Sequence, residues 1–186
     1  MTRPLIGPLQ QLGLIVRDVD QAIDHCVNVL GVGPFVVLPE QQFADYSYRG
    51  TPMTGPVCTL AFAQTETVQI ELIKQHDDVP SAYKEFYDAG GDGLQHVCVW
   101  PDTREEFEAW RQDLLDRGLT VVHEGQVDGS PLRFTYMEKP GAGWYPMIEI
   151  SEGNFPLLEQ VWAKLRAANA NWDGERRTVP VEEIFA

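Results

Sequence analysis

The chain is poor in positive charge. It has 14 Lys and Arg residues against 28 Asp and Glu residues, which gives a formal net charge of −14. Nucleic-acid binding draws most of its non-specific affinity from Lys and Arg side chains on phosphates, so this balance argues against a nucleic-acid partner. An anionic membrane surface would also repel the protein.

Long hydrophobic runs are missing as well. No apolar run approaches the roughly 20 residues that a membrane span needs, and residues 1–4 do not begin a signal peptide. The three cysteines, Cys26, Cys58 and Cys98, are odd in number and lack the Cys-x-x-Cys spacing, which fits a reducing compartment better than a disulfide framework. We therefore predict a cytoplasmic protein without membrane contact, whose cysteines are small buried hydrophobic residues.

The order of elements expected from the hydrophobic pattern repeats once along the chain. We predict one domain over residues 1–186, because a chain of this length buries a core without disulfides or metals. Each half is expected as strand, helix and three strands, over residues 8–75 and 94–152. A connector at 76–93 separates the halves, and a helix with an irregular tail follows at 153–186. The expected strands are 12–16, 34–38, 56–62 and 67–73, then 94–100, 120–123, 132–137 and 146–151.

Four polar residues occupy matching places in the two halves. Gln11 and His96 each open the first strand of a half, and Glu71 and Glu149 each lie inside a later apolar strand. Side chains alternate along a strand, and the apolar neighbours of these residues should face the helices. All four groups are therefore expected on one concave surface. Burying two carboxylates together costs on the order of several kcal/mol, and a divalent cation would remove this cost.

Three segments resemble a known family. Residues 11–20 (QLGLIVRDVD), 93–99 (GLQHVCV) and 147–150 (MIEI) look like the signature strands of the vicinal oxygen chelate superfamily. This superfamily includes glyoxalase I, methylmalonyl-CoA epimerase, extradiol dioxygenases and bleomycin-resistance proteins. The resemblance covers residues 9–152 and implies an α+β fold, in which tandem βαβββ modules form an open U-shaped barrel around one divalent metal ion.

The resemblance also implies a ligand set and a reaction. Gln11, Glu71, His96 and Glu149 match the Gln/Glu/His/Glu set of animal-type glyoxalase I and are similar to the His/Gln/His/Glu set of the epimerases. Zn, Mn, Co, Ni, Fe and Mg all suit such ligands. The implied reaction is proton abstraction next to a carbonyl of a small organic molecule, as in an isomerase, epimerase or lyase. Glu149 is the first candidate for the base and Glu71 the second.

The chain departs from the family's enzymes at several positions. Glyoxalase I has arginines four residues after its first ligand and four before its His, where this chain has Ile15 and Asp92. These replacements argue against glutathione. The second acidic base of the epimerases has no clear counterpart here, and Glu40 and Asp45 are its candidates. An extradiol dioxygenase would need a His in place of Gln11.

Substrate contacts are expected from the loops and strand ends around the open face. Aromatic rings with one Arg would suit a partly apolar substrate that carries an acid, such as an aromatic or acyl thioester. Packing of surface loops would explain the same residues. The candidates are Tyr46, Tyr48, Arg49, Trp100, Trp144 and Tyr145.

The main rival function is a metal-free binding protein, similar to the bleomycin-resistance proteins, that holds a ligand between two subunits. His96 would then be a buried structural histidine and Gln11 a plain sheet residue. The other histidines, at 25, 76 and 123, are expected to face solvent or to be satisfied locally. The apolar face of the C-terminal helix could cover this chain's own sheet or a second subunit, and a homodimer is expected.

Overall fold

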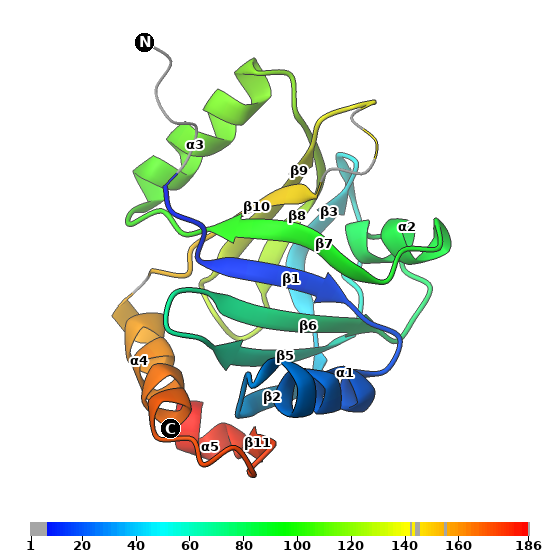
Figure 1. The fold of residues 1–186 in the computed structure, drawn as a ribbon. Coiled ribbons are helices and arrows are strands. Elements are labelled where there is room, and N and C mark those ends of the chain that lie inside the picture. Colours follow the sequence, from blue (N-terminus) through cyan, green and yellow to red (C-terminus); the bar gives the residue numbers. More distant parts are fainter. Residues whose placement is uncertain (1–6, 142, 144–145, 155, 186) are drawn as a thin grey trace.

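The computed structural model describes residues 7–141, 143, 146–154 and 156–185. Within these residues, eleven strands form one strongly curled sheet (Figure 1). The strands are β1 (Gln11–Ile15), β2 (Phe35–Gln41), β3 (Phe43–Tyr48), β4 (Thr51–Pro52), β5 (Cys58–Gln64), β6 (Gln69–Gln75), β7 (Gly93–Val99), β8 (Thr120–Val127), β9 (Arg133–Glu138), β10 (Met147–Ser151) and β11 (Thr178–Val179). The helices are α1 (Val19–His25), continued by the π-helical turn η1 (Cys26–Leu30), α2 (Ala82–Asp88), α3 (Arg104–Asp116), α4 (Pro156–Ala170) and α5 (Val181–Phe185).

The sheet has two similar halves that meet at its centre. The strand order is β11-β2-β5-β6-β1-β7-β10-β9-β8-β3-β4. β1 and β7 pair antiparallel in the middle, and each of them also pairs with a parallel neighbour, β6 or β10. The predicted α+β fold with an open curled sheet is therefore confirmed.

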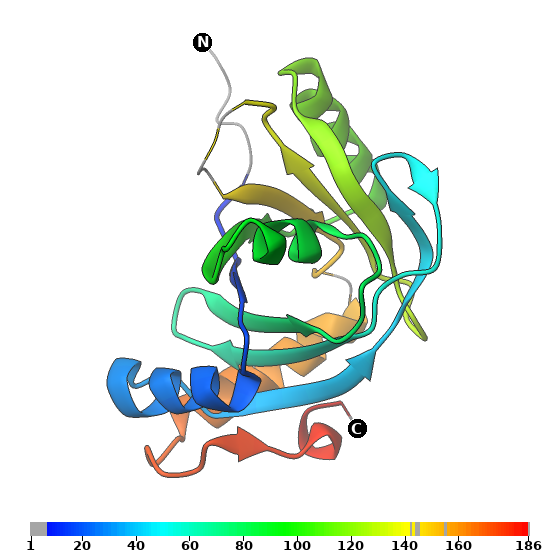
Figure 2. The ribbon, with the colours of Figure 1, turned by 90° about the vertical axis from the view of Figure 1, so that its right-hand side faces the viewer.

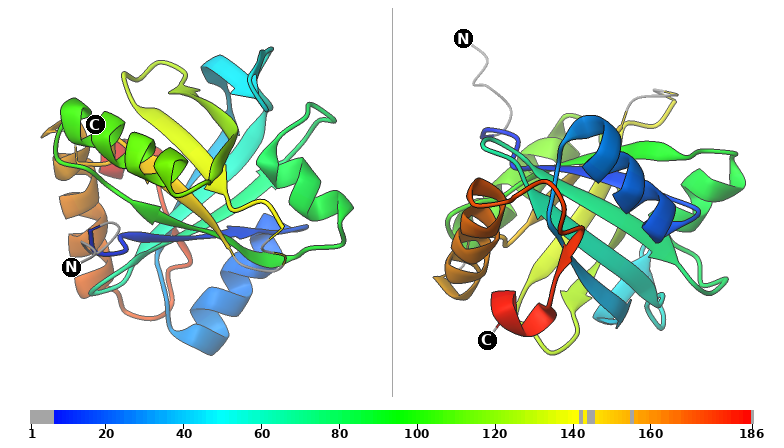
Figure 3. Two further views of the ribbon diagram at one scale, coloured as in Figure 1. Left: turned by 90° about the horizontal axis from the view of Figure 1, so that it is seen from above. Right: turned by 60° about the horizontal axis from the view of Figure 1, so that its bottom comes forward.

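Two helices cover the convex face of the sheet, one for each half (Figure 3). Val16 and Leu72 pack with Ile23 of α1, and Val99 packs with Phe107 of α3. Both helices begin where the sequence provides a cap, at Asp18 and at Thr103. The neighbours of Glu71 and Glu149 along their strands, namely Ile70, Leu72, Ile148 and Ile150, thus belong to the helix side, as the alternation predicted.

The concave side has two different ends. α2 and α4 lie at opposite ends of the curled sheet (Figures 1 and 2). Tyr83 of α2 packs against Tyr136 and His123 inside the sheet, so this end is filled by rings. At the other end, α4 contributes Val161 and Trp162 to the same interior core. The apolar face of α4 therefore packs on this chain's own sheet.

The segment between the expected strands 34–38 and 56–62, which was predicted to be a polar loop, instead contains the strands β3 and β4. β3 pairs with β8 and continues directly from β2, so one stretch of chain reaches both edges of the sheet. The loop prediction was wrong because the alternation is interrupted by two irregular positions. Glu40 and Asp45 lie where the pairing register shifts, and both have positive φ angles, of 54° and 46°.

The tail after residue 170 was expected to be irregular, and this prediction was also wrong. β11 adds a parallel strand beside β2 through Thr178 and Val179, and α5 follows it. Ile184 of α5 is buried in the interior core. No helix in the described part of the chain is long and apolar enough to cross a membrane.

Candidate metal and substrate site

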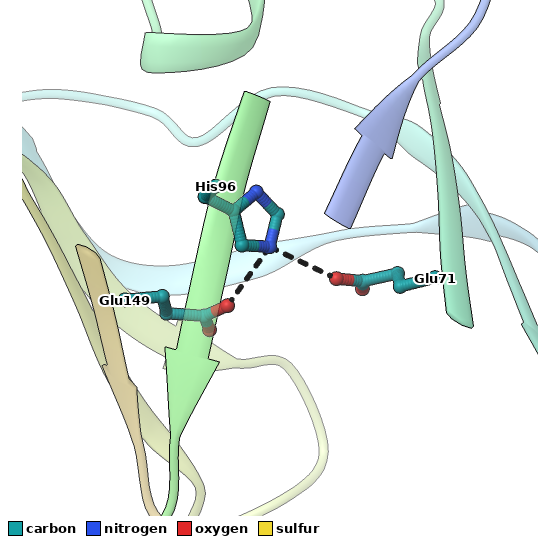
Figure 4. A group of neighbouring side chains, drawn as sticks. All are labelled: Glu71, His96 and Glu149. Atoms are coloured by element: carbon teal, nitrogen blue, oxygen red, sulfur yellow. Dashed lines mark ion pairs between the residues drawn. The ribbon is translucent and has the colours of Figure 1, made fainter. Parts of the chain in front are cut away.

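Three of the four predicted ligands meet on the concave face of the sheet. Glu71 comes from β6, His96 from β7 and Glu149 from β10, and one ligand atom of each lies within 4.8 Å of the others. The imidazole lies between the two carboxylates, with Nε2 3.4 Å from Oε2 of Glu71 and 3.1 Å from Oε2 of Glu149 (Figure 4). All three side chains are buried. Strand alternation and the central β1–β7 pairing bring these residues together from distant parts of the chain.

The fourth predicted ligand, Gln11, is buried and faces the same cavity as the two carboxylates. Its amide nitrogen donates a hydrogen bond of 2.7 Å to Oε1 of Gln69 on β6. This bond orients the amide and leaves its oxygen as the atom available to a cation.

Neighbouring side chains fix the His96 ring. Its Nδ1 lies 2.7 Å from Oε1 of Gln95, and the Gln95 amide nitrogen faces the carbonyl of Ala82 at 3.4 Å and the sulfur of Met147 at 3.3 Å. The carbonyl and sulfur accept from the amide, so Oε1 is the end that receives the Nδ1 proton. His96 therefore presents Nε2 to the carboxylates, as a metal-binding imidazole does. The Tyr136 hydroxyl lies 3.3 Å from the same Nε2 atom.

The charges of the cluster shift two pKa values. Burial lowers the pKa of His96, but contacts with Glu149 and Glu71 outweigh burial and raise this pKa to about 9. Burial raises the pKa of the Glu71 carboxyl, the contact with His96 opposes this shift, and the charge of Glu149 adds to it. An imidazolium between two carboxylates thus leaves one negative charge without a partner in the cluster.

These residues fit a divalent cation. Oε2 of Glu149 is buried and has no hydrogen-bond donor of good geometry among the described residues. Two carboxylates, an imidazole nitrogen and an amide oxygen are ligands that Zn, Mn and similar ions accept. Cys98 lies on the same face of β7, but burial holds the pKa of its thiol well above the usual value, so the thiol stays protonated.

A cavity of about 420 Å³ opens beside the cluster. Gln11, Glu71 and Glu149 form one part of its wall. Most of the remaining wall is apolar, and it includes Leu60, Phe62, Trp100, Leu158, Val161 and Trp162. The position next to a buried charged cluster makes this cavity the candidate substrate site.

Among the described residues, Trp100 is the one predicted substrate contact that lines the cavity. Trp100 lines the cavity and stacks on Trp162 of α4, with ring centroids 5.6 Å apart. Trp144 and Tyr145 lie outside the described residues. Tyr46, Tyr48 and Arg49 are not among the residues that line the cavity.

Tyr46, Tyr48 and Arg49 contact the α2 side of the molecule instead. The Tyr46 hydroxyl lies 2.9 Å from Nδ1 of His123, and the Tyr48 hydroxyl donates to Glu85 of α2. The Arg49 guanidinium pairs with Glu85 at 2.7 Å and with Glu138 at 3.0 Å. Tyr48 is the last residue of β3 and Arg49 comes directly after it. The pairing of β3 with β8 places both residues beside α2.

The candidates for a second acidic base also lie away from the cavity. Glu40 and Asp45 are exposed, and neither lines the cavity wall. Asp45 lines a separate depression with Arg111 and Arg133. Their irregular backbone serves to bend the β2–β3 ribbon.

Sequence reasoning missed His123 as an interior residue. Its side chain is fully buried among Tyr46, Tyr83, Phe134 and Tyr136. The backbone N–H of Ala82 donates to its Nδ1 at 3.3 Å, so the ring is neutral with its proton on Nε2. The position was expected to end a strand, but β8 continues to Val127.

A family model matches most of the chain. The model described as "Glyoxalase/Bleomycin resistance protein/Dioxygenase superfamily" matches residues 10–136. The chain belongs to this superfamily. The resemblance to vicinal oxygen chelate proteins is therefore confirmed. The strand β10, which carries Glu149, and the later elements α4, β11 and α5 lie beyond the matched residues.

Solved structures show the same fold at low sequence identity. A hypothetical protein from Bacillus halodurans is 17% identical, with a TM-score of 0.51, and the match covers 77% of this chain and 91% of that one. Methylmalonyl-CoA epimerase from Mycobacterium tuberculosis is 19% identical, with a TM-score of 0.50 and coverage of 81% and 91%. A variant of Streptomyces coelicolor methylmalonyl-CoA epimerase in complex with 2-nitronate-propionyl-CoA is 14% identical, with a TM-score of 0.53 and coverage of 78% and 94%. No curated protein sequence matched the chain.

Proposed function

We propose that the protein is a metal-dependent enzyme that abstracts a proton next to a carbonyl of a small organic substrate, as an isomerase, epimerase or lyase does. The observation that carries the proposal is the buried group of Glu71, His96 and Glu149 at the wall of a cavity. Perturbed titratable groups beside a cavity are typical of catalytic sites.

The metal would be held by Gln11, Glu71, His96 and Glu149. When bound, a divalent cation acts as a Lewis acid that stabilises negative charge on substrate oxygens. Zn, Mn, Co, Ni, Fe and Mg remain the candidates, because the ligand types suit each of them.

The proton is moved by a carboxylate of this chain. Glu149 is the proposed base, because its side chain lines the cavity and its buried Oε2 has no hydrogen-bond donor of good geometry among the described residues. To accept a proton from a substrate C–H, this carboxylate would leave the metal transiently. Glu71 is the second candidate, since it lines the same wall. Gln95 acts indirectly, by holding the His96 ring in place.

The apolar wall keeps water away from the reacting atoms. Trp100, Trp162 and Phe62 surround the cavity with little polar surface. Exclusion of water strengthens the electrostatic interactions of the carboxylates with a substrate.

The test is proton exchange on a defined compound. Zn²⁺-loaded protein in D₂O should introduce deuterium next to the carbonyl of 1-hydroxy-1-phenylpropan-2-one, measured by NMR. Glu149→Gln should lose most of this exchange while it keeps its metal, and Glu105→Gln on the exposed face of α3 is the matched control. Full exchange in Glu149→Gln would overturn the role of Glu149.

A metal-free binding protein is the second candidate function. It is favoured by the imidazolium of His96, which already balances one of the two carboxylates. Elemental analysis of protein purified without added metal separates the two functions. About one equivalent of a transition metal, lost in Glu71→Ala, supports the enzyme; no metal, even after incubation with Zn²⁺, supports the binder.

A cytoplasmic location and a homodimer remain predictions. The dimer no longer draws support from α4, because α4 packs on its own sheet. Light scattering of the purified protein measures its mass in solution directly.

A further inference from the structure

The charged side chains that line the cavity are all acidic among the described residues. Three carboxylates line it, Glu71, Glu149 and Asp128. No Lys, Arg or His is found among its lining residues in the described part of the chain. Asp128 is exposed at the rim, while the two glutamates are buried. The cavity thus offers no basic side chain to a charged ligand.

A bound metal would not change this conclusion for the rest of the cavity. A divalent cation balances Glu71 and Glu149, and His96 is then neutral, so the cluster carries no excess positive charge. Negative charge that develops on a substrate oxygen would be stabilised at the cluster. No other group of the described wall would stabilise a second negative charge on the same substrate. A further carboxylate or phosphate on the same substrate would have to be buried against apolar walls without a partner, which is costly.

Two arginines of the curled sheet pair with acids elsewhere, and a third arginine lines a separate depression. Arg49 pairs with Glu85 and Glu138 on the α2 side. Arg133 pairs with the buried carboxylate of Glu152 at 3.0 Å. Arg166 lines a separate depression on the other side of the Trp100 and Trp162 rings.

The apolar cover comes from a segment that lies beyond the residues matched by the superfamily model. The match ends at residue 136, and α4 and α5 follow it. α4 places Leu158, Val161 and Trp162 in the cavity wall, and α5 places Val181 and Phe185 there. The Trp162 indole donates to the carbonyl of Gly153 at 3.0 Å, which fixes its ring in the wall. This cover is built from the chain's own C-terminal segment.

We propose that the substrate is an uncharged molecule with an apolar, ring-bearing body and a pair of oxygens at one end. The body would lie against the apolar wall that Phe62, Trp100 and Trp162 form together, and the oxygens would face Glu71 and Glu149. This inference rests on the proposed function for the oxygen end, while the apolar body follows from the cavity wall alone. Coenzyme A thioesters and glutathione conjugates are outside this substrate class, because their distant anionic groups find no basic residue in the described wall.

The experiment compares two ligands that differ in one charge. Binding of 4-methylcatechol and of 3,4-dihydroxybenzoate to Zn²⁺-loaded protein is measured by calorimetry, with acetyl-CoA as a third ligand. 4-Methylcatechol should bind at least roughly tenfold more tightly than 3,4-dihydroxybenzoate, because the carboxylate must be buried without a partner. Acetyl-CoA should not bind. Equal or tighter binding of the benzoate or of acetyl-CoA, or no binding of 4-methylcatechol, would overturn the proposal.

A charge reversal at the rim tests the cause of the preference. Asp128→Lys should raise the affinity for 3,4-dihydroxybenzoate roughly two- to tenfold more than that for 4-methylcatechol. Glu105→Lys changes the net charge equally but lies outside the cavity, so it should leave the ratio of the two affinities unchanged. An unchanged ratio in Asp128→Lys would overturn the electrostatic explanation.

Metal content distinguishes a failure of the proposed function from a failure of the inference about substrate charge. Zn²⁺ stoichiometry is measured on the same samples, and a protein that takes up no metal would contradict the proposal of a metal-dependent enzyme. The inference about charge is then judged on metal-free protein with toluene and benzoate, which lack the two adjacent ring hydroxyl groups of the catechols. Preference for toluene supports the apolar wall, and preference for benzoate overturns it.

Discussion

The imidazole of His96 lies directly against the backbone of Gly13. The two residues are paired across the central β1–β7 ladder. A Cβ atom at Gly13 would lie 1.8 Å from Cε1 of His96 and 2.0 Å from Nε2. These atoms belong to a ring and cannot move aside independently. Glycine is therefore required here because the ring occupies the space of a side chain.

Gly13→Ala should displace His96 and weaken metal binding. The added methyl group forces the ring out of the cluster or shifts the strand, and overpacking of this kind costs roughly 1–3 kcal/mol of unfolding free energy. Zn²⁺ affinity and urea denaturation of the variant measure both effects. Gly125→Ala, at a strand glycine where the nearest contact would be 3.2 Å, is the control and should change metal affinity little. Unaltered Zn²⁺ affinity in Gly13→Ala would contradict this account.

Gln95→Leu should lower the affinity for Zn²⁺. Leucine removes the acceptor at Nδ1 of His96, so the ring loses its preferred tautomer and orientation. Loss of such a partner typically costs 10–100-fold in metal affinity, and we expect roughly this range.

Gln95→Glu is the matched variant, since its carboxylate keeps an acceptor at Nδ1. It should retain most of the affinity. If Gln95→Leu and Gln95→Glu lose affinity equally, packing and not the hydrogen bond holds the ring.

Most of the site followed from strand periodicity. Gln11, Glu71, His96 and Glu149 were predicted on one face because alternation fixes the direction of each side chain once its strand is known. The structure brings three of them together and places Gln11 at the same cavity. Long-range pairing itself was not visible in the sequence. It came from the resemblance to a duplicated fold.

Other parts of the site could not be predicted because local signals were misleading. The backbone of Glu40 and Asp45 interrupts the alternation, so β3 looked like a loop and the positions of Tyr48 and Arg49 were misjudged. His123 follows a register shift after Val121, which the alternation rule does not anticipate.

The part that the C-terminal segment plays in covering the cavity was not predicted from the sequence either. β11 has only two residues and α5 only five, which is too short for a periodic pattern. Their places are set by packing on β2 and α4, and such tertiary contacts leave little trace in a local sequence.

Zn²⁺ binding should release about one proton at pH 7. In metal-free protein the pKa of His96 is raised to about 9, so the ring is protonated at pH 7 and must lose this proton to bind the metal. Affinity should therefore rise about tenfold per pH unit below pH 9. Calorimetry in buffers of different ionisation enthalpy measures the number of protons released. Zero release at pH 7 would mean that His96 is neutral before metal binds, and His96→Gln should abolish the release.

His123 should make the fold less stable in acid. Burial lowers its pKa from 6.5 to about 3, and the charge of His96 adds to this shift. Between these two values the unfolded chain binds a proton that the folded protein excludes. Stability is therefore lost as the pH falls below 6.5, by about 1.4 kcal/mol per pH unit for this residue.

The contribution of His123 is isolated by comparing the wild type with His123→Phe in urea between pH 6.5 and 4.5. Phenylalanine keeps a ring among Tyr83, Phe134 and Tyr136 but cannot titrate. Although the variant loses the contacts of Nδ1 with Tyr46 and Ala82, its unfolding free energy should fall less steeply with pH than that of the wild type. His25→Gln, at an exposed histidine of α1, is the matched control for the loss of one histidine. Identical slopes for the wild type and His123→Phe would show that His123 stays uncharged in the unfolded chain or gains a proton in the folded one.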